Sequence, residues 1–125
     1  MRYLKRVLLI CLFISMLSAC QTASVMSENA VGEHDRVETN NPAVKSLLDQ
    51  ARSDRVRFYL EEATAKLERA LRIEPINPYL WFELAQVKAD SQESHQAKNL
   101  ALKARSYASG NLGLQSQIDD FISNL

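Results

Sequence analysis

The sequence predicts an all-α protein whose ordered part consists of two helical hairpins and a final helix. From residue 41 onward, apolar residues recur at i, i+3, i+4 and i+7, which is the spacing of an amphipathic helix. The pair Asn-Pro, a helix-start signal, occurs at Asn41 and again at Asn77. Small residues repeat at a constant spacing, so that Ala63 and Ala70 are matched by Ala97 and Ala104.

The first hairpin is predicted over residues 42–55 and residues 59–74. Asn41 caps its first helix and Pro42 occupies the first turn, where a missing backbone N–H costs nothing. Pro75 stops the second helix because proline cannot continue a helical hydrogen-bond pattern. The apolar residues of the two helices are Val44, Leu47, Leu48 and Ala51, then Leu60, Ala63, Leu67, Ala70 and Leu71.

The second hairpin and a last helix follow the second Asn-Pro pair. Asn77 opens a third helix, Ser94 is predicted to cap a fourth, and Gly110 is predicted to close it in the left-handed conformation. Asn111 is predicted to cap the last helix, and this helix is expected to cover the end of the repeat stack. The apolar residues are Leu80, Trp81, Leu84, Ala85 and Val87, then Ala97, Leu100, Ala101 and Ala104, and finally Leu114, Ile118, Phe121, Ile122 and Leu125.

The stretch LERALRIEPINPYLWFELAQV resembles the junction of two tetratricopeptide repeats, and the constant spacing of the alanines equals the period of that family. The resemblance covers roughly residues 44–109 and implies helical hairpins that stack through small residues. The first repeat departs from the family at its inter-helix turn, where Arg57-Phe58-Tyr59 stands in place of the preferred glycine. The residues expected to pack the repeats are Ala63, Ala70, Pro75, Trp81, Leu84, Ala85, Ala97 and Ala104.

The start of the chain resembles a bacterial lipoprotein signal. Basic residues precede an apolar stretch over residues 7–16, which is too short to span a bilayer, and Leu17-Ser18-Ala19-Cys20 follows. This quartet resembles a lipobox, which implies removal of residues 1–19 and attachment of lipid to Cys20. The alternative is a secreted protein with an incidental cysteine at this position.

The polar residues 20–40 are predicted to form the lipidated N-terminus and a flexible tether, followed by a helical domain over residues 41–125. Because Gln21, and not Asp, follows the lipidated cysteine, the resemblance favours an outer-membrane anchor with the body facing the periplasm. A tether of this length would reach roughly 65 Å when fully extended.

Composition excludes several classes of function. The chain has 15 basic and 15 acidic residues, and three of the basic ones lie in the signal, so the mature chain is net acidic and no nucleic-acid partner is expected. Cys11 leaves with the signal, and the body has no thiol for a disulfide. His34 and His95 have no neighbouring ligands at metal-binding spacing. We therefore expect no enzyme activity, no metal and no cofactor.

A partner-binding groove is predicted on the first helix of each hairpin, by analogy with the repeat family. The candidate residues are Lys45, Leu48, Arg52, Arg55, Tyr79, Phe82 and Gln86. Arginine and aromatic side chains of this kind are enriched in protein interfaces. The alternative is that Leu48 and Phe82 belong to the core and the arginines are only solvated. An apolar edge left exposed would suit a second copy of the chain or another partner.

Anchor, tether and repeats together resemble the small outer-membrane lipoproteins of the Lpo type, which activate class A penicillin-binding proteins. This resemblance implies a protein-binding adaptor in peptidoglycan synthesis. Two alternatives remain, namely a pilotin-like assembly factor for a pilus or secretion system, and a structural lipoprotein of the envelope.

Overall fold

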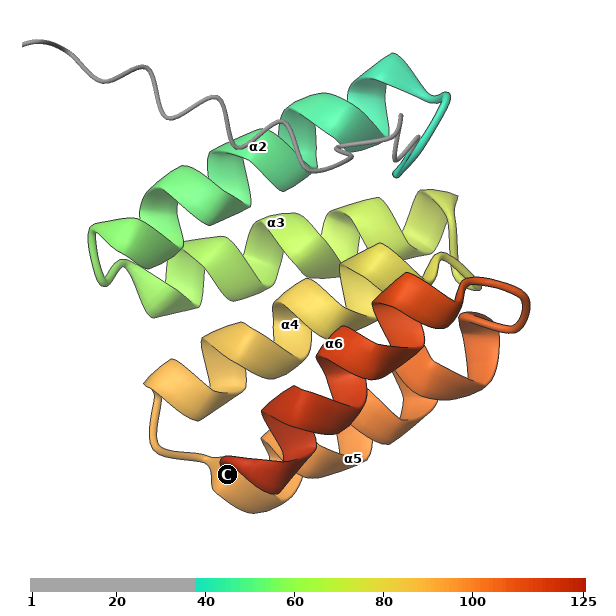
Figure 1. Ribbon diagram of the computed structural model, residues 1–125. Coiled ribbons are helices and arrows are strands. Elements are labelled where there is room, and N and C mark those ends of the chain that lie inside the picture. The colour runs from blue at the N-terminus through green and yellow to red at the C-terminus, as the bar shows by residue number, and fades with distance from the viewer. Residues whose placement is uncertain (1–37) are drawn as a thin grey trace, which may run out of the picture. The chain divides into compact units, whose positions relative to one another are not determined.

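The computed structural model describes residues 38–125, and within them the chain is all-α, as predicted. The helices pack as antiparallel pairs followed by a single helix (Figure 1). Their bounds are α2 Pro42–Val56, α3 Leu60–Ile73, α4 Pro78–Asp90, α5 Ser94–Tyr107 and α6 Leu112–Ser123. None of the helices in this part of the chain is sufficiently long and apolar to cross a bilayer. The predicted signal, Cys20 and most of the predicted tether lie outside the described residues.

Asparagine side chains cap the first helix of each repeat unit. The Asn41 Oδ1 atom accepts from the backbone N–H of Ala43 at 2.9 Å, and that of Asn77 accepts from Tyr79 at 2.9 Å. Asn111 repeats the arrangement at the start of α6, one repeat period after Asn77. Each cap satisfies backbone donors that have no partner within the helix. The last helix therefore begins where the first helix of a third repeat would begin.

Two details of α5 differ from the prediction. Ser94 does not cap the helix: it is the first helical residue, and Glu93 holds the cap position without a side-chain hydrogen bond to the helix. Gly110 is left-handed, with φ of +87°, but the helix has already ended at Tyr107. The glycine instead shapes the loop into α6, where the Asn111 N–H donates to the carbonyl of Ala108 at 3.0 Å.

The turns within the two hairpins, between α2 and α3 and between α4 and α5, have the same geometry, although neither contains glycine. Phe58 and Gln92 occupy equivalent positions in the two repeats and have φ of 62° and 63°. Equivalent backbone hydrogen bonds close the two turns, each of 2.9 Å: Phe58 N to Arg55 O, Tyr59 N to Asp54 O, Gln92 N to Ala89 O and Glu93 N to Lys88 O. These pairs form a Schellman motif. The first repeat thus keeps the turn geometry of the second despite its unusual sequence.

We expect Gln92→Gly to raise the free energy of unfolding by about 0.5–1 kcal/mol, because glycine removes the steric cost of a left-handed backbone. The matched change Gln50→Gly, at an exposed position inside α2, should lower it by a similar amount. Thermal unfolding followed by circular dichroism would measure both. A lower melting temperature for Gln92→Gly would contradict the left-handed turn.

The core depends on alanines where helices approach closely. The five alanines predicted to pack the repeats have 0% exposure, namely Ala63, Ala70, Ala85, Ala97 and Ala104. Leu84 is buried, and Trp81 is partly buried. Pro75 is exposed, so it is not a packing residue. Its carbonyl accepts from the Trp81 indole N–H at 2.8 Å, and its ring ends α3.

The helical domain extends slightly further toward the N-terminus than predicted. The Asn77 side chain donates to the carbonyl of Glu38 at 2.8 Å, and the Thr39 hydroxyl donates to Glu74 at 2.6 Å. Residues 38–40, predicted as the end of the tether, are thus hydrogen-bonded to the α3–α4 loop and to the start of α4.

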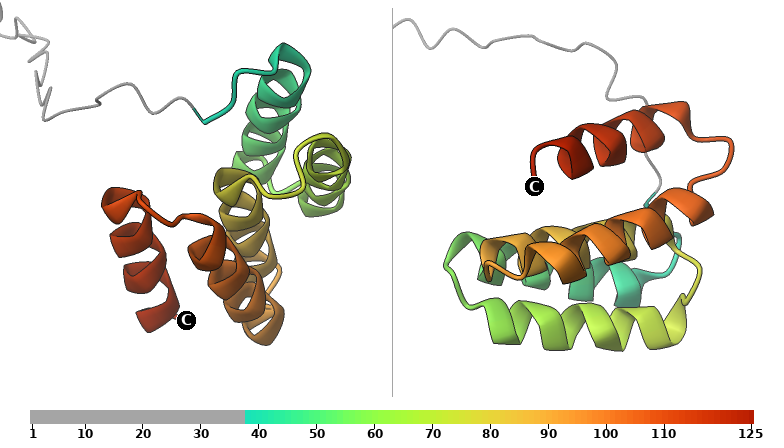
Figure 2. Two further views of the ribbon diagram at one scale, coloured as in Figure 1. Left: turned by 90° about the vertical axis from the view of Figure 1, so that its right-hand side faces the viewer. Right: turned by 90° about the horizontal axis from the view of Figure 1, so that it is seen from below.

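The last helix covers the second hairpin, as expected for a cap. Leu114 and Ile118 are buried against α5, and Phe121 packs edge-on against Phe82 with ring centroids 5.4 Å apart. Figure 2 shows α6 running beside α5 at the end of the stack. α6 thus takes the place of the first helix of a third repeat and closes the apolar end of the domain.

Candidate functional site

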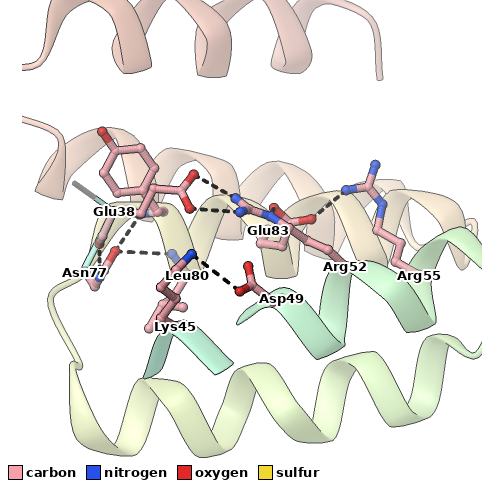
Figure 3. Close-up of polar contacts among 9 residues, drawn as sticks. Glu38, Lys45, Asp49, Arg52, Arg55, Asn77, Leu80 and Glu83 are labelled. Atoms are coloured by element: carbon pink, nitrogen blue, oxygen red, sulfur yellow. Dashed lines mark hydrogen bonds and ion pairs between the residues drawn. The ribbon is translucent and has the colours of Figure 1, made fainter. Parts of the chain in front are cut away.

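A cluster of charged side chains joins α2 to α4, centred on the carboxylate of Glu83. This residue is 5% exposed. It accepts from the Arg52 Nε at 3.0 Å and from the Arg55 Nη1 at 2.8 Å. Figure 3 shows the two arginines rising from α2 toward Glu83 on α4. Because they are one helical turn apart, both can reach the same carboxylate.

Further partners surround this centre. The Glu38 carboxylate accepts two hydrogen bonds from Arg52, at 2.8 and 2.9 Å, in the paired geometry that suits a guanidinium. Arg55 donates to Asp90 at 2.7 Å and to Gln86 at 2.6 Å. The hydrogen bonds that Arg52 donates to Glu38 are the largest of the effects that raise the pKa of Arg52 above its ordinary value, and partial burial opposes them.

The arrangement leaves no free cation in the cluster. Two arginines face three carboxylates, and within residues 38–125 no buried side-chain nitrogen or oxygen lacks a hydrogen-bond partner. Such a network holds two helices at a fixed angle, because moving either one would strand a buried charge. The cluster therefore links the first hairpin to the second.

The structure brings together three of the seven predicted groove residues. Arg52, Arg55 and Gln86 lie in this cluster, each bonded to another member of it. Lys45 lies apart from it on the exposed face of α2, where it pairs with Asp49 at 3.4 Å. The arginines are thus neither free for a partner nor simply solvated.

The three apolar and aromatic candidates have other roles. Leu48 is 1% exposed and belongs to the core, so its prediction as a partner-facing residue is wrong. Phe82 packs against Phe121, and the Tyr79 hydroxyl accepts from the Asn111 side chain at 2.8 Å. Both aromatic residues therefore hold α6 in place.

Glu83 was missed at the sequence level, although a signal for it existed. It lies in the buried stripe of α4 formed by Leu80, Leu84 and Val87, at the i+3 position. An acidic residue in an apolar stripe requires a cationic partner, and arginines on a neighbouring helix could supply it. Glu38 carried no comparable signal, because it lies outside any periodic segment.

No protein-family model and no curated protein matches the chain. Among solved structures, the globular C-terminal domain of P. aeruginosa LpoP matches it with a TM-score of 0.65 and 33% sequence identity. The match covers 67% of this chain and 79% of the LpoP domain. The chain belongs to the LpoP family. The resemblance to the Lpo type, drawn from the repeat junction and the anchor, is thereby confirmed.

Membership of the LpoP family gives the repeat architecture a context. In this chain the α2–α4 cluster, the inter-helix turns and the capping helix all serve to fix two hairpins against each other. A rigid helical domain of this kind suits a protein that works by presenting a surface. We therefore expect any binding site of this LpoP-family domain to lie on its surface.

Proposed function

We propose that this chain is an outer-membrane lipoprotein that binds a class A penicillin-binding protein in the periplasm and stimulates its synthesis of peptidoglycan. The observation that carries the proposal is the match to the LpoP globular domain. In this proposal the chain contributes no catalytic group. It acts as an adaptor, so its effect depends on shape and charge at an interface.

One feature of the described residues supports an adaptor. The helices are fixed by caps, small-residue packing and the Glu83 cluster, so a binding surface would be pre-organised and would lose little entropy on association.

The anchor is proposed from the sequence alone. Lipid on Cys20 would attach the mature chain to the outer membrane, since more than one acyl chain gives lasting membrane attachment. The segment between Cys20 and the helical domain would then set how far the domain stands from the membrane. A synthase rooted in the inner membrane would have to extend part of the way toward it.

Replacing Cys20 by alanine should abolish incorporation of labelled fatty acid, because the thiol that receives the lipid is missing. The Cys20→Ala chain should also be missing from the outer-membrane fraction. Metabolic labelling and membrane fractionation would measure the two effects, with Cys11→Ala as the control that keeps both. Retention of the Cys20→Ala chain in the outer membrane would show that another segment anchors it.

The partner can be tested by affinity purification from detergent-solubilised envelopes, with the mature protein tagged at its exposed C-terminus. A fluorescent penicillin labels penicillin-binding proteins covalently and would identify them among the retained proteins. We expect a class A penicillin-binding protein to be retained. Its absence, together with loss of pili or of secretin multimers on deletion of the gene, would overturn the proposal.

A further inference from the structure

A groove runs along the side of the domain formed by α3, α4 and α5, away from the Glu83 cluster. It consists of two hollows of about 490 and 510 Å³. Glu68 and Lys88 line both hollows, which therefore adjoin each other. The groove spans α3 from Leu60 to Arg72, which is about 18 Å at the rise of an α-helix.

The floor of the first hollow is apolar and includes the chain's single tryptophan. Leu71, Trp81, Leu84 and Leu100 line it. The Lys103 ammonium lies 3.8 Å from the centroid of the Trp81 ring. A partly buried tryptophan beside leucines offers the kind of site in which an interface anchors an apolar side chain.

Unpaired charges of opposite sign lie at the two ends of the groove. Arg72 and Lys103, at the tryptophan end, have no carboxylate partner within residues 38–125. At the other end, Glu61 has no cationic partner in the same part of the chain, and neither has Glu68 at the junction. The groove is therefore positive at one end and negative at the other.

This pattern differs from that of the α2–α4 face, where each arginine is bonded to carboxylates of the same domain. Charges satisfied internally give a partner little to gain, because the existing bonds must first be broken. Unpaired charges beside an apolar floor can be complemented by a partner without that cost. Charge complementarity thus favours the groove over the predicted face.

We propose that the groove between α3 and α5 binds an amphipathic segment of the penicillin-binding protein, an inference that rests on the proposed function. The segment places apolar side chains on Trp81 and Leu100. Its carboxylates lie over Arg72 and Lys103, and its cations lie toward Glu61 and Glu68. A helix of about three turns has the length of the groove, and helices commonly bind in this manner.

Reversing both cations, in the variant Arg72→Glu with Lys103→Glu, should weaken binding of the purified synthase at least tenfold. The control Lys98→Glu reverses a single charge at an exposed position of α5 that does not line the groove. It should bind as the unmodified protein does. Circular dichroism would confirm that all variants keep their helices, and biolayer interferometry would measure affinity.

A photo-crosslinking side chain at Gln96, which lines the groove, should capture the synthase. The same group at Lys98 should not. If the unmodified protein binds while the double reversal binds equally well and Gln96 captures nothing, the groove proposal is overturned and the proposed function stands. If the unmodified protein fails to bind the synthase at all, the proposed function itself is overturned.

Discussion

Replacing both Arg52 and Arg55 by alanine should lower the free energy of unfolding by about 3–5 kcal/mol, because it leaves a buried carboxylate without a partner. Glu83 is 5% exposed and receives a hydrogen bond from each arginine. Neither hydrogen-bond donor remains in the double variant. Urea denaturation followed by circular dichroism at neutral pH would measure the loss.

Two further variants make this result specific. Adding Glu83→Met to the double variant should restore much of the stability, since an apolar side chain of similar length removes the stranded charge. Lys45→Ala breaks only an exposed pair and should change stability by less than about 0.5 kcal/mol. Unfolding of the double variant at the same urea concentration as the unmodified protein would show that the cluster does not hold the hairpins together.

Replacing Ile118 by alanine should cost about 2–5 kcal/mol, because Ile118 has 0% exposure and its loss leaves a cavity under α6. The capping helix covers Ala85, Ala101 and Ala104, whose small side chains cannot fill that space. In a domain of this size such a loss is a large part of the total stability.

Leu112→Ala is the matched control, because Leu112 lies on the same helix but is 79% exposed. It should change stability by less than about 0.5 kcal/mol. In thermal unfolding, the melting temperatures of the two variants should differ by many degrees. Similar melting temperatures would mean that α6 does not close the stack.

The helices were predictable because their boundaries are encoded locally. Asparagine caps and prolines mark the starts of α2 and α4, and the apolar period marks the faces that pack. The main departures from the prediction arose at the turns between helices. Ser94 is a good cap residue, but the Schellman turn at Gln92 places Glu93 at the cap position. Phe58 adopts a left-handed conformation that its residue type disfavours.

The candidate site was predictable only in part. Arg52, Arg55 and Gln86, which the helical period placed on one predicted face, lie in one cluster. The helical period could not show that Glu83 would neutralise the arginines, because that pairing depends on the angle between two hairpins. Nor could it show that α6 would cover Phe82. The groove on the opposite side of α4 arises from the separation of α3 and α5, which no local pattern records.

The proposed activation of a synthase is tested most directly by the initial rate of glycan polymerisation. A purified class A penicillin-binding protein would be supplied with its lipid-linked precursor, with and without the mature chain. We predict that the rate rises with the concentration of the chain and then saturates, while the chain alone polymerises nothing. An unchanged rate at concentrations that saturate binding would contradict the account.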